Sequence, residues 1–263
     1  MATRPEPDLD RLVEQLHDAD VAVVLQAVWR AEERLAGSPD AEFRQTLEAL
    51  LSLFYVDLVD RPDLEDAIDR VVEVVARQGA RAVPVLLAQM RSSDIKSHLH
   101  LARSLAHMGR EALPALRELA ATDEDRYART FALYALGKMS CPEVVQSLPE
   151  VIGGLMHPDR EVRDTAARTL GKIARVAPLA ELTRRRRQEM FEALLRATHD
   201  REAPVRAKAM RSLGVMGEVG LLDEEQKGQV ERGLRAALGE SDEGHWDQAY
   251  IVRREAREAL GKL

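Results

Sequence analysis

The chain has 263 residues, of which 45% are hydrophobic and 32% are charged, so it can bury a core and remain soluble. Only 4% of the residues are aromatic, which leaves aliphatic side chains and methionine to fill that core. Acidic residues outnumber lysine and arginine by 45 to 38, and the resulting net charge of −7 argues against wholesale non-specific attraction to nucleic acid.

The single cysteine, Cys141, excludes an intramolecular disulfide and a cysteine-based zinc site. The N-terminal segment lacks the apolar core of a signal peptide, and no run of about 18 uncharged apolar residues is present to span a bilayer. We therefore expect a cytoplasmic protein that does not associate with membranes.

The N-terminal part of the chain predicts two irregular helical hairpins, over residues 9–36 and 40–78. In the first, Asp20 precedes Val23, Ala27 and Ala31, which have the spacing of one helix face. Val24 stands where later repeats have arginine. The second hairpin is the most degenerate, and its hydrophobic residues are Phe43, Leu47, Leu50, Leu51, Phe54 and Tyr55.

The rest of the chain predicts five more regular hairpins, over residues 81–108, 110–139, 142–176, 178–216 and 222–263. Four segments share the pattern V/A-R-x-x-A-x-x-x-L-G, and they begin at Ala128, Val162, Val205 and Val252. Apolar residues at positions i, i+4 and i+8 form one stripe of a helix and do not fit a strand. Each segment is therefore predicted to be a helix, with acidic or turn residues before it as a cap or a tight turn.

The repeated pattern resembles the HEAT repeat family, in particular the bacterial HEAT-like repeats that are also found in phycobilisome lyases. The resemblance implies an all-α solenoid, a right-handed superhelix of about seven HEAT-like helical hairpins. Because one hairpin cannot bury its apolar face alone, we expect residues 1–263 to form a single domain, with degenerate repeats at 9–78 and regular repeats at 81–263.

The resemblance also implies a structural role for the repeated arginine. In HEAT-like proteins this residue joins acidic residues of the turns in a ladder, which we expect for Arg129, Arg163, Arg206 and Arg253. In the third repeat His98 takes the same place, and we expect it to interrupt the ladder.

The resemblance further implies that the second helix of each hairpin lines a concave surface. Residues five and nine positions after the repeated arginine lie on its solvent side, and most are basic or aromatic. They predict a stripe that suits an acidic protein segment, a phosphorylated ligand or a nucleic-acid backbone. A competing interpretation is that Lys138, Lys172 and Lys262 only complement the negative end of the helix dipole. The predicted partner-binding residues are Trp29, Arg103, His107, Tyr134, Lys138, Arg168, Lys172 and Arg211.

The densest charge run is 184–187, four consecutive arginines. Four cations in the first turn of a helix would face the positive end of its dipole, which is unfavourable. Pro178 suits the first position of a helix, so we expect the helix to begin there and to carry the arginines in its second turn, on a solvated outer face. The alternative is that the run forms a patch that binds a phosphate or a partner.

No catalytic constellation is found in the sequence. Seven histidines are scattered along it, and there is no glycine-rich phosphate loop, nucleophile elbow or metal-ligand pattern. We expect a non-catalytic scaffold or adaptor, without metal or cofactor, that binds another protein or an acidic segment on its concave face. Nucleic acid is disfavoured by the net charge. The resemblance leaves open a bilin lyase-like chromophore chaperone, or a HEAT-like nucleic-acid-binding or DNA repair protein.

Overall fold

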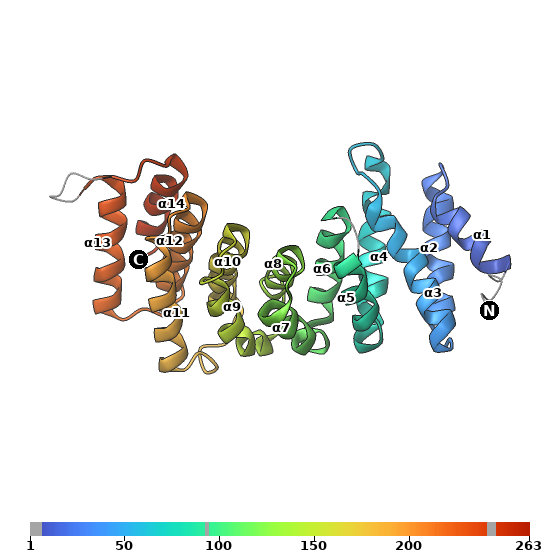
Figure 1. Ribbon diagram of the computed structural model, residues 1–263, viewed down its shortest axis with the longest axis horizontal. Helices are drawn as coiled ribbons and strands as arrows, with labels where there is room; N and C mark the ends of the chain where they lie inside the picture. The colour runs from blue at the N-terminus through green and yellow to red at the C-terminus, as the bar shows by residue number, and fades with distance from the viewer. Residues whose placement is uncertain (1–6, 93–94, 241–245) are drawn as a thin grey trace. The chain divides into compact units, whose positions relative to one another are not determined.

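A computed structural model describes residues 7–92, 95–240 and 246–263 of the chain (Figure 1). Within these ranges every regular element is an α-helix or a 3₁₀ helix, and the 14 α-helices follow one another as seven hairpins. The predicted all-α solenoid class is therefore confirmed. The chain divides into two compact units, Met1–Ala112 and Leu113–Leu263, which are described separately. That all the hairpins form one domain stays a prediction.

The first unit contains three hairpins. They are α1 (Pro7–Leu16) with α2 (Val21–Leu35), α3 (Asp40–Leu51) with α4 (Glu65–Arg77), and α5 (Val83–Ser92) with α6 (Ile95–Met108). The second helices α2, α4 and α6 pack against one another in that order. The degenerate second hairpin has a long connection, which includes two short 3₁₀ helices at Ser52–Tyr55 and Pro62–Leu64. Leu53 and Phe54 in this connection are buried, so the segment also contributes to the core.

The second unit contains four hairpins. They are α7 (Leu113–Thr122) with α8 (Arg126–Leu136), α9 (Leu148–Gly154) with α10 (Arg160–Val176), α11 (Arg184–Ala197) with α12 (Ala203–Glu218), and α13 (Glu224–Leu238) with α14 (Tyr250–Leu260). The second helices α8, α10, α12 and α14 pack in order, each against the next. We call their exposed side the second-helix face.

The glycine that ends the repeated pattern allows close packing between successive second helices. A Cβ atom added to Gly214 in α12 would lie 2.7 Å from the Cβ of Ala259 in α14 and 2.8 Å from its Cα. These distances are shorter than van der Waals contact, so any larger residue at position 214 requires the two helices to move apart.

The start of α11 differs from the sequence prediction. The helix begins at Arg184 and not at Pro178. The backbone N–H groups of Glu181 and Leu182 both donate to the carbonyl of Pro178, which closes a turn instead of a helix. Leu182 is buried, and the Thr183 hydroxyl accepts the backbone N–H of Arg186 as an N-cap. These local contacts place the arginines in the first turn, against the positive end of the dipole.

Candidate binding face

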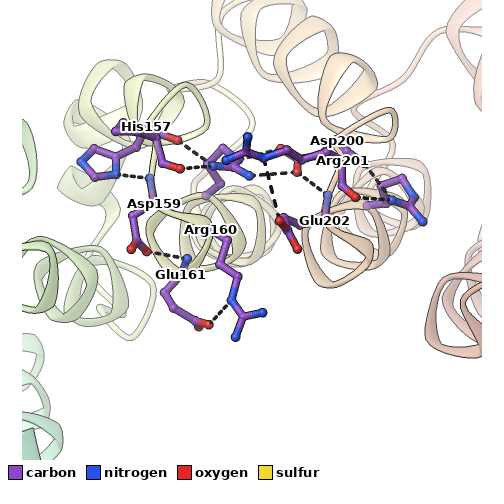
Figure 2. Close-up of polar contacts among 10 residues, drawn as sticks. His157, Asp159, Arg160, Glu161, Asp200, Arg201 and Glu202 are labelled. Carbon is purple, nitrogen blue, oxygen red and sulfur yellow. Dashed lines mark hydrogen bonds and ion pairs between the residues drawn. The ribbon is translucent and has the colours of Figure 1, made fainter.

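The repeated arginines of two hairpins form the predicted ladder. Figure 2 shows polar contacts in the two turns that the first rung joins, which contain His157 and Asp200. Arg163 donates from Nε and Nη2 to the two carboxylate oxygens of Asp200, at 2.7 and 3.1 Å, and from Nη1 to the carbonyls of His157 and Pro158. Arg206 repeats this geometry with both carboxylate oxygens of Asp247. Each of these arginines therefore fixes its own turn and joins it to the next one, which confirms their structural role.

The ladder stops at the hairpin of Arg129. The carboxylate of Asp200 accepts a hydrogen bond from the backbone N–H of Glu202. The equivalent residue of the preceding turn is His157, and its Nδ1 accepts a hydrogen bond from the backbone N–H of Asp159. His157 thus preserves the turn but brings no carboxylate to Arg129. Arg129 instead donates from Nε and Nη2 to the carbonyl of Asp123.

The last repeated arginine also bonds to carbonyls. Arg253 donates from Nη1 to the carbonyls of Asp247 and Gln248, and its guanidinium stacks on the Trp246 ring, 4.3 Å from the ring centroid. In the residues that the structure describes, no carboxylate lies within ion-pair distance of it. Arg129 and Arg253 are therefore turn residues without the inter-hairpin link.

In the first unit the predicted stripe is not continuously basic. Trp29 on α2 is 55% exposed, and His107 on α6 is exposed and lines a surface hollow of about 440 Å³ between α4 and α6. Arg103 on α6 is ion-paired with Asp69 on α4 at 2.8 Å. The hollow also contains Glu73. Carboxylates thus lie beside the basic residues of the stripe in this unit.

In the second unit four of the predicted residues come together on α8, its C-terminal end and α10. The amines of Lys138 and Lys172 lie 5.6 and 5.8 Å from the centroid of the same Tyr134 ring. Burial, followed by the charges of Lys138 and Arg168, lowers the pKa of Lys172. We call Tyr134, Lys138, Arg168 and Lys172 the Tyr134 cluster.

The cations of the Tyr134 cluster lack strong partners. No carboxylate of the described chain lies within 4.0 Å of the amines of Lys138 and Lys172. The nearest carboxylate to Arg168 is that of Asp164, at 3.8 Å, which is too far for a hydrogen bond. The Nε of Arg168 is buried and has no acceptor among the described residues. The cluster therefore presents two lysine amines, on the exposed Lys138 and the half-buried Lys172, that are available to an anion.

Arg211 has a different environment. Its Nε and Nη2 donate to both oxygens of Glu255, at 2.7 and 2.5 Å, and Glu255 is fully buried. Burial raises the pKa of Glu255, but hydrogen bonds from Arg211 and Arg254 outweigh it and hold the pKa below its usual value. Arg211 therefore neutralises a buried carboxylate and links α12 to α14, and its part in partner binding stays a prediction.

Lys208 was not among the residues predicted from the sequence. It lies two positions after Arg206, on α12, and burial lowers its pKa. Asp164, Arg168, Arg211 and Glu255 all contribute to its electrostatic environment, which places it beside the Tyr134 cluster. The signal was present in the sequence, because residues 208 and 211 share a helix face at i and i+3.

Other candidate chemistry is weak in this structure. Among the described residues, no three His, Cys, Asp or Glu side chains are grouped so that they could hold a metal ion. Burial and the nearby charge of Glu143 raise the pKa of the Cys141 thiol, which disfavours the reactive thiolate. Nor is any described helix both long enough and apolar enough to cross a bilayer.

Comparison with known proteins identifies the repeats. Residues 83–154 match a family model described as HEAT repeats, and residues 148–177 match one described as HEAT repeat. The chain contains HEAT repeats. None of the curated proteins compared with this sequence matches it.

Solved structures share the HEAT-like fold at low sequence identity. A chain of the Kap95p complex with RanGDP is 14% identical, with a TM-score of 0.58 over 97% of this chain and 35% of that one. A chain of the complex of CpcE and CpcF of phycocyanin lyase from Nostoc sp. PCC7120 is 20% identical, with a TM-score of 0.54 over 68% of this chain and 97% of that one. An engineered protein is 20% identical, with a TM-score of 0.50 over 98% of this chain and 96% of that one. These matches establish the HEAT-like solenoid fold and leave the ligand open.

Proposed function

We propose that the protein is a non-catalytic interaction module that binds an extended acidic segment of another protein on the second-helix face of α8, α10 and α12. The observation that carries this proposal is the Tyr134 cluster, in which Lys138, Arg168 and Lys172 approach one another without hydrogen-bonded carboxylates. The repeat fold supports the proposal, because stacked hairpins commonly mediate protein interaction through extended surfaces.

The electrostatics of the cluster favour an anionic partner. The pKa of Lys172 is lowered by burial and by two neighbouring cations, so the folded protein holds this charge at a cost. A bound carboxylate would offset the repulsion and raise that pKa again. Hydrogen bonds between charged groups contribute about 1.5–3 kcal/mol each. A carboxylate held by both lysines would therefore bind more tightly than one that is only attracted to the surface without hydrogen bonds.

The geometry favours an extended chain over a compact ligand. Adjacent packed helices lie about 8–10 Å apart, so the face from α8 to α12 spans roughly 20 Å. An extended peptide covers about 3.3–3.6 Å per residue and crosses this distance with about six residues. The half-buried ring of Tyr134, close to both lysine amines, offers such a chain an apolar contact.

Fluorescence anisotropy with a labelled decapeptide of alternating Glu and Gly tests the proposal. Lys138→Gln with Lys172→Gln should weaken binding at least tenfold, about 1.4 kcal/mol. The control is Lys227→Gln with Arg235→Gln on α13, which removes the same charge from cations paired with Glu224 and Glu231, and it should change binding less than twofold. Equal losses in both variants, or no binding by the unmodified protein, would reject the proposed face.

Two competitors distinguish the alternatives that the HEAT-like resemblance left open. A 20-base-pair DNA duplex that displaces the peptide at much lower concentration, with a steep dependence on salt, would support the nucleic-acid alternative. A bilin whose absorbance changes on mixing would support the chromophore chaperone. The proposal expects neither result.

A further inference from the structure

The arginine run at the start of α11 divides into two pairs with different environments. Arg185 is bonded to Glu189 at 2.8 Å, and Arg186 donates to the carbonyl of Glu181 at 2.7 Å and lies 3.9 Å from its carboxylate. The side chains of Arg184 and Arg187 form no hydrogen bond or ion pair with the described residues, and the Nε of Arg187 is buried. Only half of the run is therefore compensated by carboxylates of the chain.

The two uncompensated arginines line one pocket. Its volume is about 330 Å³, and it lies between the first turn of α11, the connection from α12 to α13 and the first turn of α13. Its walls also include Gln188, Leu222, Asp223 and Gln226. Residues 184 and 187 share this side of the helix because they are three positions apart. A volume of this size is at the lower end of small-molecule sites.

The rest of the pocket wall is held in place by hydrogen bonds between side chains of α11 and α13 and the backbone at the start of α13. The side-chain amide of Gln226 donates to Gln188 at 2.8 Å, and its carbonyl oxygen accepts the backbone N–H of Asp223. One carboxylate oxygen of Asp223 accepts the backbone N–H of Gln226, which completes a capping box at the start of α13. The pocket thus pairs two guanidinium groups with fixed amide and carboxylate groups that suit ligand hydroxyls.

The position of the arginines is unfavourable for folding alone. Cations in the first turn of a helix face the positive end of its dipole, and a buried guanidinium donor without an acceptor costs further free energy. Side chains that break a local rule without compensation within the fold often mark a functional site. An anion bound by the guanidinium groups of Arg184 and Arg187 would offset the unfavourable dipole interaction, and guanidinium groups match the geometry of a phosphoryl group.

From this arrangement we infer that the pocket is a second, independent binding site for a small phosphomonoester. Arg184 and Arg187 hold the phosphoryl group, and the hydroxyl-bearing part of the ligand lies against Gln188, Gln226 and Asp223. The site is separate from the proposed peptide-binding face, because the Tyr134 cluster lies on α8 and α10 and none of its residues lines this pocket.

Isothermal titration calorimetry with glucose 6-phosphate tests the site. Arg184→Gln with Arg187→Gln should weaken binding at least tenfold. Arg185→Gln with Arg186→Gln is the matched control, since it removes the same charge from the same run but spares the pocket, and its affinity should stay within threefold. Lys138→Gln with Lys172→Gln should leave this binding unchanged, which separates the site from the proposed peptide function.

Further ligands identify the source of the phosphoryl group. Glucose should not bind, and inorganic phosphate should bind more weakly than glucose 6-phosphate if the amide wall contributes. A phosphoserine peptide that binds more tightly than glucose 6-phosphate would assign the phosphoryl group to a modified protein, contrary to the inference. Absence of glucose 6-phosphate binding by the unmodified protein, or equal loss in the two arginine variants, would overturn it.

Discussion

Arg163 and Asp200 are 37 residues apart in sequence and are joined by two hydrogen bonds, with side chains only 7% and 13% exposed. The pKa of Arg163 is raised, chiefly by its hydrogen bond to Asp200. Because the pair links the turn before α10 to the turn before α12, it couples the packing of two hairpins. This role is distinct from the exposed cations of the second-helix face.

Removing Arg163 should destabilise the second unit strongly. Arg163→Ala leaves the Asp200 carboxylate and two turn carbonyls without their donor, and breaking such a largely buried pair costs about 3 kcal/mol. Urea unfolding followed by circular dichroism measures the change. Arg160→Ala is the control, because its pair with Glu161 is about 60% exposed on both sides and should contribute less than about 1 kcal/mol. Similar losses in the two variants would contradict the ladder's role.

His157 should make stability depend on pH. Burial, followed by the charge of Arg129, lowers the pKa of His157 below 6.5. The unfolded chain then binds the proton more tightly than the folded one, so the free energy of unfolding is largest above pH 6.5 and falls as the pH decreases through the folded pKa.

The substitution His157→Asp should remove this contribution and extend the ladder. Aspartate retains an acceptor for the backbone N–H of Asp159 and brings a carboxylate toward Arg129, as Asp200 does toward Arg163. We expect a gain of about 1 kcal/mol at pH 6 and a smaller decrease between pH 7 and pH 5. Thermal melts across this range give the result, and a slope identical to that of the unmodified protein would show that His157 does not titrate as described. His100 contributes in the same direction in the first unit.

The close approach of α12 and α14 predicts opposite effects for two glycine substitutions. Gly214→Ala forces a methyl group against Ala259 and should cost about 1–3 kcal/mol. Gly233→Ala in α13 meets nothing within 4 Å and should stabilise by roughly 0.5–1 kcal/mol, because alanine favours the helix. The two melting temperatures, measured side by side, should move in opposite directions. A stabilised Gly214→Ala variant would mean that the helices separate freely.

Substitutions of Arg211 and Lys172, two cations of the predicted stripe, should have different effects: the first on stability and the second on peptide binding. Arg211→Gln leaves the buried Glu255 with fewer donors and should lower the free energy of unfolding by about 2 kcal/mol. Lys172→Gln removes a charge that its neighbours repel, so stability should be unchanged or slightly higher while acidic-peptide binding weakens. Denaturant titration and peptide binding on the same samples test this. A strong loss of stability in Lys172→Gln would assign that lysine to the fold instead.

Sequence periodicity was sufficient to locate the hairpins, because each second helix repeats an apolar stripe that only a helix explains. The pairing of charges was not accessible in the same way. Arg103 and Arg211 were predicted as binding residues, but each meets a carboxylate of a neighbouring helix, Asp69 or Glu255, which lies 34 or 44 residues away. An alignment of the repeats compares each residue with the equivalent residue of the other repeats. It does not show which residue of a neighbouring helix that side chain will contact.

The start of α11 could not be derived from the dipole argument. The dipole disfavours four arginines at the helix terminus, but the turn from Pro178, the buried Leu182 and the Thr183 cap decide where the helix begins. Local contacts of this kind depend on the packing around them, so a general electrostatic preference is a weak guide when several determinants compete.

The Asp200 turn also has a consequence for proteolysis. Arg201 is exposed, with 75% of its side chain accessible, and is on that ground a site for trypsin. Its carbonyl, however, accepts a hydrogen bond from Nη1 of Arg206, and the adjacent Asp200 is held by both Arg163 and Arg206. A protease must pull the peptide bond into an extended conformation, which requires these bonds to break. The cleavage rate after Arg201 therefore reports opening of the ladder and not the accessibility of the side chain.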